Sequence, residues 1–180
     1  MSPSKLYLAD QLLAVIQKKI CMIGTSGVGK TSLVAKFVHS MFSDKYLTTV
    51  GVKIDKKTVS VDGVEMMLMI WDLAGDDDYQ RLQSSYLRGT SGYLLVADGT
   101  RKITLDQAIE IQGRVGEAAG PLPFLLALNK ADLNSQWEID DARTANLAAR
   151  GWKSFRTSAK DGAGVEEAFV ELGRMMSQTK

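Results

Sequence analysis

One eight-residue, glycine-containing segment constrains this chain more than any other feature. Residues 24–31 read GTSGVGKT, which matches the pattern G-x-x-x-x-G-K-[ST], and they lie between an apolar, strand-like segment and a helical pattern. In such a loop, glycines let backbone N–H groups turn inward around phosphate oxygens, and the helix N-terminus adds partial positive charge. The segment therefore predicts an α/β fold that binds a nucleoside di- or triphosphate.

The residue types in this loop indicate how the phosphates are held. Lys30 supplies a full positive charge to the outer phosphates, and the hydroxyl of Thr31 is a suitable ligand for Mg²⁺. The loop positions predicted to contact the nucleotide are Ser26, Gly27, Val28, Gly29, Lys30, Thr31 and Ser32.

Apolar segments alternate with helical patterns along the rest of the chain. We expect strands at residues 19–23, 50–61, 64–71, 92–98, 124–129 and 153–156, and helices at 30–40, 78–88, 105–118, 139–149 and 165–176. Asp62 and Gly63 form a dipeptide that favours a tight hairpin between the second and third strands. The pattern predicts a six-stranded, mostly parallel sheet with one antiparallel edge pair and about five helices on both faces.

Composition excludes several classes of protein. The 180 residues carry 22 basic and 21 acidic side chains, a net charge of +1, so a nucleic-acid partner held by bulk electrostatics is not expected. The single cysteine, Cys21, and single histidine, His39, exclude a disulfide framework and a zinc cluster, which favours a reducing, cytoplasmic location. Ser2 excludes myristoylation, and no cysteine follows Cys21, so we expect no encoded lipid anchor.

A second motif indicates which base is bound. Residues 129–132 read NKAD at the end of the fifth expected strand, on the sheet edge where ligands bind in open α/β folds. Asp132 can accept two hydrogen bonds from the ring N–H and exocyclic amine of guanine, whereas adenine offers no matching pair of donors. Residues 157–160, which read TSAK, follow the last strand and are a weak signal alone.

Taken in order, residues 24–31, 72–75, 129–132 and 158–160 resemble the motif set of the Ras superfamily of small GTPases, from about residue 18 to 176. Ser26 and residues 161–165 make the chain most similar to the Rab branch. The resemblance implies a single P-loop G domain at 18–180 after an extension at 1–17. It also implies a guanine-nucleotide-dependent switch that binds GTP or GDP with Mg²⁺ and hydrolyses GTP.

The same resemblance implies partners. Effector proteins would read the nucleotide state through residues 42–51 and 74–88, which triphosphate and magnesium order and hydrolysis releases. Activating and exchange proteins would control that state. We expect the protein itself to be a monomer.

On the base side, the resemblance places Phe42 beside the guanine and Lys130 across its ring face, with the Ala159 N–H donating to its carbonyl oxygen. The other matched positions on this side are Asn129, Asp132, Ser158 and Lys160.

On the phosphate side, the resemblance implies that Thr31, Thr49 and Asp72 hold Mg²⁺, the last through water. Thr49 would also sense the γ-phosphate, with Tyr46 nearby, and Gly75 would donate its N–H to that phosphate.

The most informative departure from the family follows Gly75. Most members have a glutamine next, whereas this chain has Asp76, followed by Asp77 and Asp78. The glutamine orients the attacking water with an amide that both donates and accepts hydrogen bonds. Ionised aspartate cannot donate, is one methylene shorter and brings negative charge towards the γ-phosphate. We therefore expect slow GTP hydrolysis, with Lys30, Gly75 and Asp76 as the candidate catalytic positions.

Three explanations of Asp76 stay open: a partner supplies an arginine finger, the protein is a nearly inactive GTP-bound module, or Gln80 or another nearby side chain replaces the glutamine. An alternative class is a nucleotide-gated binding module, a pseudo-GTPase or an excised domain, in which GTP is a structural ligand. A small-molecule kinase is disfavoured because the chain has no obvious acceptor-binding insertion or lid.

The two ends of the sequence carry separate expectations. We expect a helix from about residue 4 to residue 16, whose apolar positions either cover the domain or bind a membrane or partner. Rab-like proteins usually continue into a tail with prenylated cysteines, but this sequence stops soon after its last helix. It is either truncated or works without a lipid.

Overall fold

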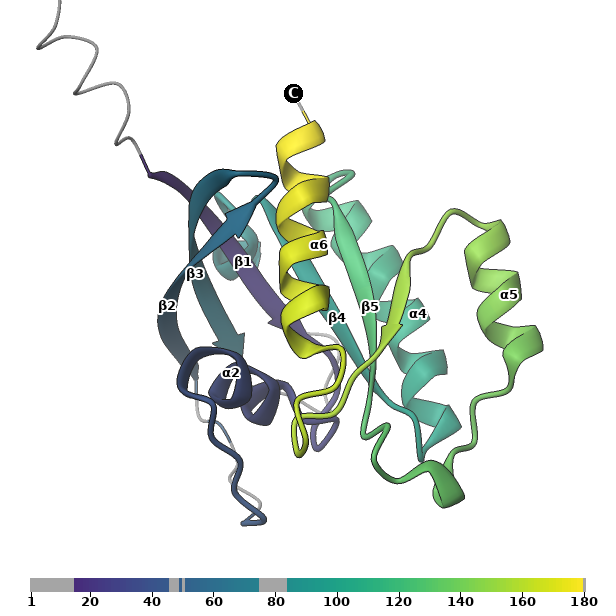
Figure 1. Cartoon of the computed structure of the whole chain (residues 1–180). Coiled ribbons are helices and arrows are strands. Elements are labelled where there is room, and N and C mark those ends of the chain that lie inside the picture. The colour runs from purple at the N-terminus through teal and green to yellow at the C-terminus, as the bar shows by residue number, and fades with distance from the viewer. Residues whose placement is uncertain (1–14, 46–48, 50, 75–83, 180) are drawn as a thin grey trace, which may run out of the picture.

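A six-stranded sheet forms the centre of the protein in the computed structural model, which describes residues 15–45, 49, 51–74 and 84–179 (Figure 1). The strand order is β2-β3-β1-β4-β5-β6, and every neighbouring pair is parallel except β2 and β3. The strands are β1 (Ile16–Ile23), β2 (Val52–Val61), β3 (Val64–Leu73), β4 (Gly92–Asp98), β5 (Phe124–Asn129) and β6 (Ser154–Arg156). The predicted α/β fold with one antiparallel edge pair is confirmed.

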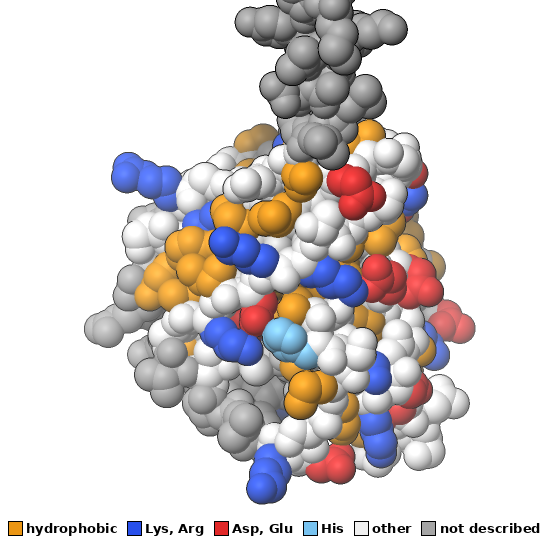
Figure 2. Space-filling view, turned by 60° about the vertical axis from the view of Figure 1, so that its left-hand side comes forward, with side chains coloured by type: hydrophobic (Ala, Val, Ile, Leu, Met, Phe, Trp, Pro, Cys, Tyr) orange, Lys and Arg blue, Asp and Glu red, His pale blue; other side chains and the backbone are white. Residues whose placement is uncertain are grey.

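The β2–β3 connection is the tight hairpin that Asp62 and Gly63 predict. Their φ angles are 50° and 82°, in the left-handed region that glycine and aspartate tolerate better than most residues. β2 is one edge of the sheet, and Figure 2, which turns that side forward, shows charged side chains scattered among apolar ones. Such charges oppose edge-to-edge pairing between molecules.

Helices cover both faces of the sheet. They are α2 (Lys30–His39), α3 (Ser84–Leu87), α4 (Lys102–Ala119), α5 (Asp141–Ala149) and α6 (Val165–Gln178), with a short 3₁₀ helix, η2 (Asn134–Gln136), that the sequence pattern does not predict. Figure 1 shows α6 in front of the sheet and α4 behind it. Of the helix expected at 78–88, only residues 84–88 lie in the described part of the chain; Ser84–Leu87 are helical and Arg88 is in a turn.

Strand alternation produces two cores. In β1, Ile20 and Met22 face the core under α2 and α6, whereas Cys21 and Ile23 face the core under α4. Phe37 of α2 stacks on Phe169 of α6 with ring centroids 3.9 Å apart, which fixes these two helices against each other. The central strands of the sheet are therefore covered on both faces, whereas most residues of the edge strand β2 are exposed or only half-buried.

Two helix and strand boundaries differ from the predictions for identifiable reasons. α5 begins at Asp141 rather than residue 139, because the side chain of Asp140 accepts the backbone N–H of Arg143 and caps the helix. The helix expected at residues 4–16 does not include Ile16, which pairs with Met66 as the first residue of β1. The rest of that expected helix lies outside the described residues, apart from Val15, which is not helical.

The lone cysteine provides a test of the packing. Burial raises the pKa of the Cys21 thiol, although a contact with the Thr90 hydroxyl at 3.2 Å opposes this shift. Because the thiolate is the reactive form, we expect iodoacetamide to label native protein on the order of a hundredfold more slowly than urea-denatured protein at the same pH. Equal labelling rates would contradict a buried Cys21. In the unfolded protein this thiol ionises near pH 9, before it does in the folded protein. The free energy of unfolding should therefore fall as the pH rises above 9.

No helix among the described residues is long and apolar enough to cross a membrane.

Candidate functional site

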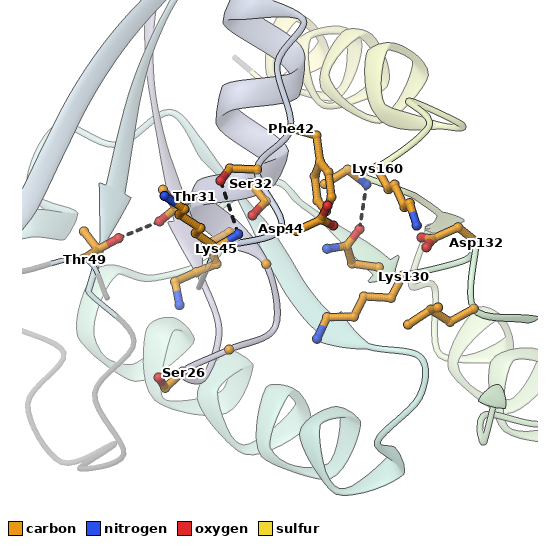
Figure 3. Close-up of a pocket in the computed structure, with 17 residues that line it drawn as sticks. Ser26, Thr31, Ser32, Phe42, Asp44, Lys45, Thr49, Lys130, Asp132 and Lys160 are labelled. Atoms are coloured by element: carbon orange, nitrogen blue, oxygen red, sulfur yellow. Dashed lines mark hydrogen bonds between the residues drawn. The ribbon is translucent and has the colours of Figure 1, made fainter. Parts of the chain in front are cut away.

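A cavity of about 310 Å³ opens at the carboxyl edge of the sheet, where the loops after β1, β5 and β6 meet (Figure 3). Thirteen of its lining residues are positions predicted to contact a nucleotide, namely Ser26, Gly27, Gly29, Lys30, Thr31, Ser32, Phe42, Thr49, Asn129, Lys130, Asp132, Ala159 and Lys160. Figure 3 shows Phe42, Lys130, Asp132 and Lys160 toward one end, with Ser26, Thr31 and Thr49 toward the other. Four segments far apart in sequence thus form one site.

Two glycines in the loop after β1 are required by close contacts. A Cβ atom on Gly24 would lie 2.4 Å from the carbonyl oxygen of Val96, and one on Gly29 would lie 2.3 Å from Nδ2 of Asn129. Gly29 also has a φ of 100°, a backbone conformation that residues with a Cβ atom adopt only with strain. The loop therefore needs glycine both for its own turn and to approach β4 and the end of β5.

Gly29→Ala is expected to weaken GDP binding at least about tenfold, because the new methyl group must push the buried Asn129 amide away from its hydrogen bonds. Equilibrium titration with fluorescent GDP measures the loss. The matched control is Gly113→Ala in α4, where a Cβ meets nothing within 4 Å. Unchanged GDP affinity in Gly29→Ala would contradict the close approach of these two loops.

Lys30 is held inside the loop that it closes. Its side chain is buried, and Nζ donates to the carbonyl oxygens of Gly24 at 2.8 Å and Thr25 at 3.0 Å. Burial lowers the pKa of Lys30 from 10.5 to about 8, while the nearby Asp72 carboxylate opposes part of that shift. A bound phosphate would supply the negative charge that favours the protonated ammonium.

Three oxygen-bearing side chains meet beside Lys30. Thr31 donates its hydroxyl hydrogen to Oδ2 of Asp72 at 2.6 Å, so in its 2.5 Å contact with Oγ1 of Thr49 it is the acceptor. The other carboxylate oxygen of Asp72, Oδ1, is buried and has no hydrogen-bond partner among the described residues. Burial raises the pKa of this carboxyl, and the Thr31 hydrogen bond and Lys30 oppose that shift. An unpartnered carboxylate oxygen beside two hydroxyls fits a hard cation such as Mg²⁺.

Asn129 joins three loops at the other end of the cavity. Its Nδ2 donates to the carbonyl oxygen of Val28 at 3.0 Å, and its Oδ1 accepts from the N–H of Ala159 and the hydroxyl of Thr157, each at 3.3 Å. The hydroxyl of Ser158 donates to Oδ1 of Asp132 at 2.8 Å. These contacts hold the Asp132 carboxylate against the loop after β6, with one oxygen held by serine.

Some predicted positions support the cavity without lining it. Val28 packs in the core and contributes its carbonyl to Asn129, Ser158 is buried beneath Asp132, and Asp72 lies behind Thr31. Tyr46, Gly75 and Asp76 lie outside the described residues. The cavity also has lining residues that motif matching does not identify, namely Ser43, Asp44, Lys45 and Leu133; their only sequence signal is that they adjoin Phe42 and Asp132.

Comparison with known proteins agrees with this geometry. The model of the Ras family matches residues 19–178. The human Ras-related protein Rab-8B is 35% identical over 158 residues, covering 87% of this chain and 76% of the relative. The dog Ras-related protein Rab-13 and the Dictyostelium discoideum Ras-related protein Rab-1D are 34% and 35% identical over the same share of this chain, each with 78% of its own length covered. The chain therefore belongs to the Ras family as a Rab-like small GTPase, a GTP hydrolase that binds GTP or GDP with Mg²⁺ and acts as a molecular switch with effector, exchange and activating proteins as its partners.

Proposed function

We propose that this protein switches through residues 42–51 and 74–88 and hydrolyses GTP slowly. The observation that carries the first part is the 2.5 Å contact between the hydroxyls of Thr49 and Thr31. Thr49 belongs to the segment 42–51, and Thr31 belongs to the phosphate loop. A ligand at Thr31 therefore acts directly on a residue of this segment, which supports a surface that changes with the nucleotide.

We assign the nucleotide contacts as follows. The loop of residues 26–32 surrounds the phosphates, with the Lys30 ammonium on the outer ones, and Phe42, Lys130, Asp132 and Ala159 contact the guanine. Thr31, Thr49 and Asp72 hold Mg²⁺, whose chemistry is to neutralise phosphate charge. The glycine contacts, the buried ammonium and the unpartnered Oδ1 of Asp72 support this assignment.

The slow rate is an inference from Asp76. Catalysis of phosphoryl transfer depends on positioning and electrostatics. An ionised carboxylate at this position cannot donate a hydrogen bond to the attacking water, and it repels the negative charge that develops on the γ-phosphate. The proposed catalytic residues are Lys30 and Gly75, and Asp76 occupies the third catalytic position without supplying the function of the usual glutamine. A partner that supplies an arginine, or Gln80 from the same segment, would raise the rate.

The switching proposal is tested by hydrogen exchange of residues 42–51. With Mg²⁺ and a nonhydrolysable GTP analogue we expect these amides to be more protected than with GDP, because Thr49 then contacts Mg²⁺ and the γ-phosphate. Thr49→Ala should remove the difference, whereas Thr58→Ala, an exposed threonine in β2, should keep it. Equal protection with both nucleotides in the unmodified protein would contradict the proposal.

A second candidate function is favoured by Asp76 itself: a nucleotide-gated binding module, with negligible hydrolysis, whose state is set by exchange. This module would show the same hydrogen-exchange protection of residues 42–51, but its bound GTP would persist without hydrolysis. We also propose that the protein acts in the cytoplasm as a monomer. The free, buried thiol of Cys21 fits the reducing conditions of that compartment.

A further inference from the structure

Asp98, at the end of β4, holds two parts of the nucleotide site at once. Its side chain is only 1% exposed. Oδ1 accepts the backbone N–H of Thr100 at 2.9 Å and its hydroxyl at 2.6 Å, while Oδ2 accepts Nζ of Lys130 at 2.8 Å and Nε of Arg101 at 3.0 Å. Although burial opposes ionisation, the donors from Lys130, Thr100 and Arg101 hold the pKa of Asp98 below its usual value.

Arg101 extends this network to the phosphate loop. While Nε contacts Asp98, the terminal Nη2 donates to the backbone carbonyl of Ser26 at 3.4 Å. Ser26 lines the cavity toward its phosphate end, whereas Lys130 lines it toward the base end (Figure 3). One buried carboxylate therefore links a residue of each loop, through Arg101 on one side and Lys130 on the other.

The segment that carries Arg101 is itself fixed. The N–H of Gly99 donates to the carbonyl of Asn129, and its carbonyl accepts the N–H of Glu138, both at 2.9 Å. A Cβ atom on Gly99 would lie 2.0 Å from the ring of Trp137, so this turn is packed without free space. Arg101 thus reaches Ser26 from a rigid support.

We propose that Arg101 is a positioning residue that fastens the phosphate loop to the base-binding loop and thereby slows nucleotide release. Ser26 and Lys130 both line the cavity, so a nucleotide bound there contacts both loops, and loosening the link between the loops should speed its release. The proposal depends on nucleotide binding and is independent of the rate of hydrolysis.

The planar guanidinium explains why arginine suits this position. Its separate nitrogens contact Asp98 and Ser26 at the same time, in a fixed fork. A lysine would preserve the charge beside Asp98, but its single ammonium on a flexible chain would not reproduce both contacts. Arg101→Lys therefore distinguishes the effect of the simultaneous contacts with Asp98 and Ser26 from the effect of a positive charge beside Asp98.

The test compares Arg101→Gln, Arg101→Lys and the control Lys102→Gln, which removes a positive charge one residue away. The release rate of fluorescent GDP is measured in Mg²⁺ at one ionic strength, and stability is measured by urea unfolding. We expect release about three- to tenfold faster in both Arg101 variants, the range for one ordinary hydrogen bond, because the contact with Ser26 is exposed and 3.4 Å long. Arg101→Lys should keep a wild-type unfolding midpoint, and Lys102→Gln should release GDP at the wild-type rate.

Three results would overturn the proposal. If Arg101→Gln released GDP at the wild-type rate, the contact with Ser26 would have no effect on nucleotide release. Wild-type release from Arg101→Lys would assign the effect to the charge on Asp98 alone. Equally fast release from Lys102→Gln would assign it to long-range electrostatics. Failure to bind GDP in the unmodified protein would instead contradict the nucleotide site itself.

Discussion

Replacing Asp132 with asparagine is expected to lower the affinity for GDP and GTP on the order of a hundredfold to ten-thousandfold. The carboxylate accepts two hydrogen bonds from guanine in our assignment, each worth about 1.5–3 kcal/mol because the acceptor is charged. Asparagine removes the charge and can place its amide donors against the donors of the base. Isothermal titration with GDP measures the loss.

Matched probes separate a change in recognition from a loss of structure. Xanthosine diphosphate has a carbonyl where GDP has the exocyclic amine, so Asp132→Asn should bind it more tightly than the unmodified protein does. Asp141→Asn removes an exposed carboxylate from the first turn of α5 and should leave GDP affinity unchanged. Equal GDP affinity in Asp132→Asn and the unmodified protein would contradict the assignment of the base.

Asp76→Gln is expected to accelerate single-turnover hydrolysis of bound GTP about tenfold to a hundredfold, the range that a misplaced water-orienting group costs. The substitution restores a neutral amide that donates and accepts, and it removes a negative charge near the γ-phosphate. Asp77→Gln removes the same charge one residue later and serves as the control, which should show a much smaller acceleration.

The remaining outcomes distinguish the explanations of Asp76. An unchanged or slower rate in Asp76→Gln would contradict the repulsion argument. If Gln80→Ala abolishes the residual hydrolysis of the unmodified protein, Gln80 performs the task of the missing glutamine. If neither change matters and an activating protein restores the rate, the partner supplies the missing group.

The alternation of buried strands and helical segments sufficed to predict the sheet and its antiparallel edge, because sheet topology follows from local pattern and short connections. Motif spacing likewise identified most residues that line the cavity. Contacts between distant segments escaped prediction: Arg101 and Ser26 are 75 positions apart, and neither lies in a pattern that pairs it with the other. The capping by Asp140 and the start of β1 at Ile16 depend on similarly specific geometry.

The most direct test is to release and quantify the nucleotide bound to freshly purified protein, and then follow its conversion for hours with magnesium at room temperature. The proposed slow switch predicts stoichiometric guanine nucleotide, with bound GTP converted gradually to GDP. Bound GTP that persists unchanged would contradict slow cycling and support the nucleotide-gated binding module. Protein that carries no guanine nucleotide, and takes up none when GDP is added, would contradict the account as a whole.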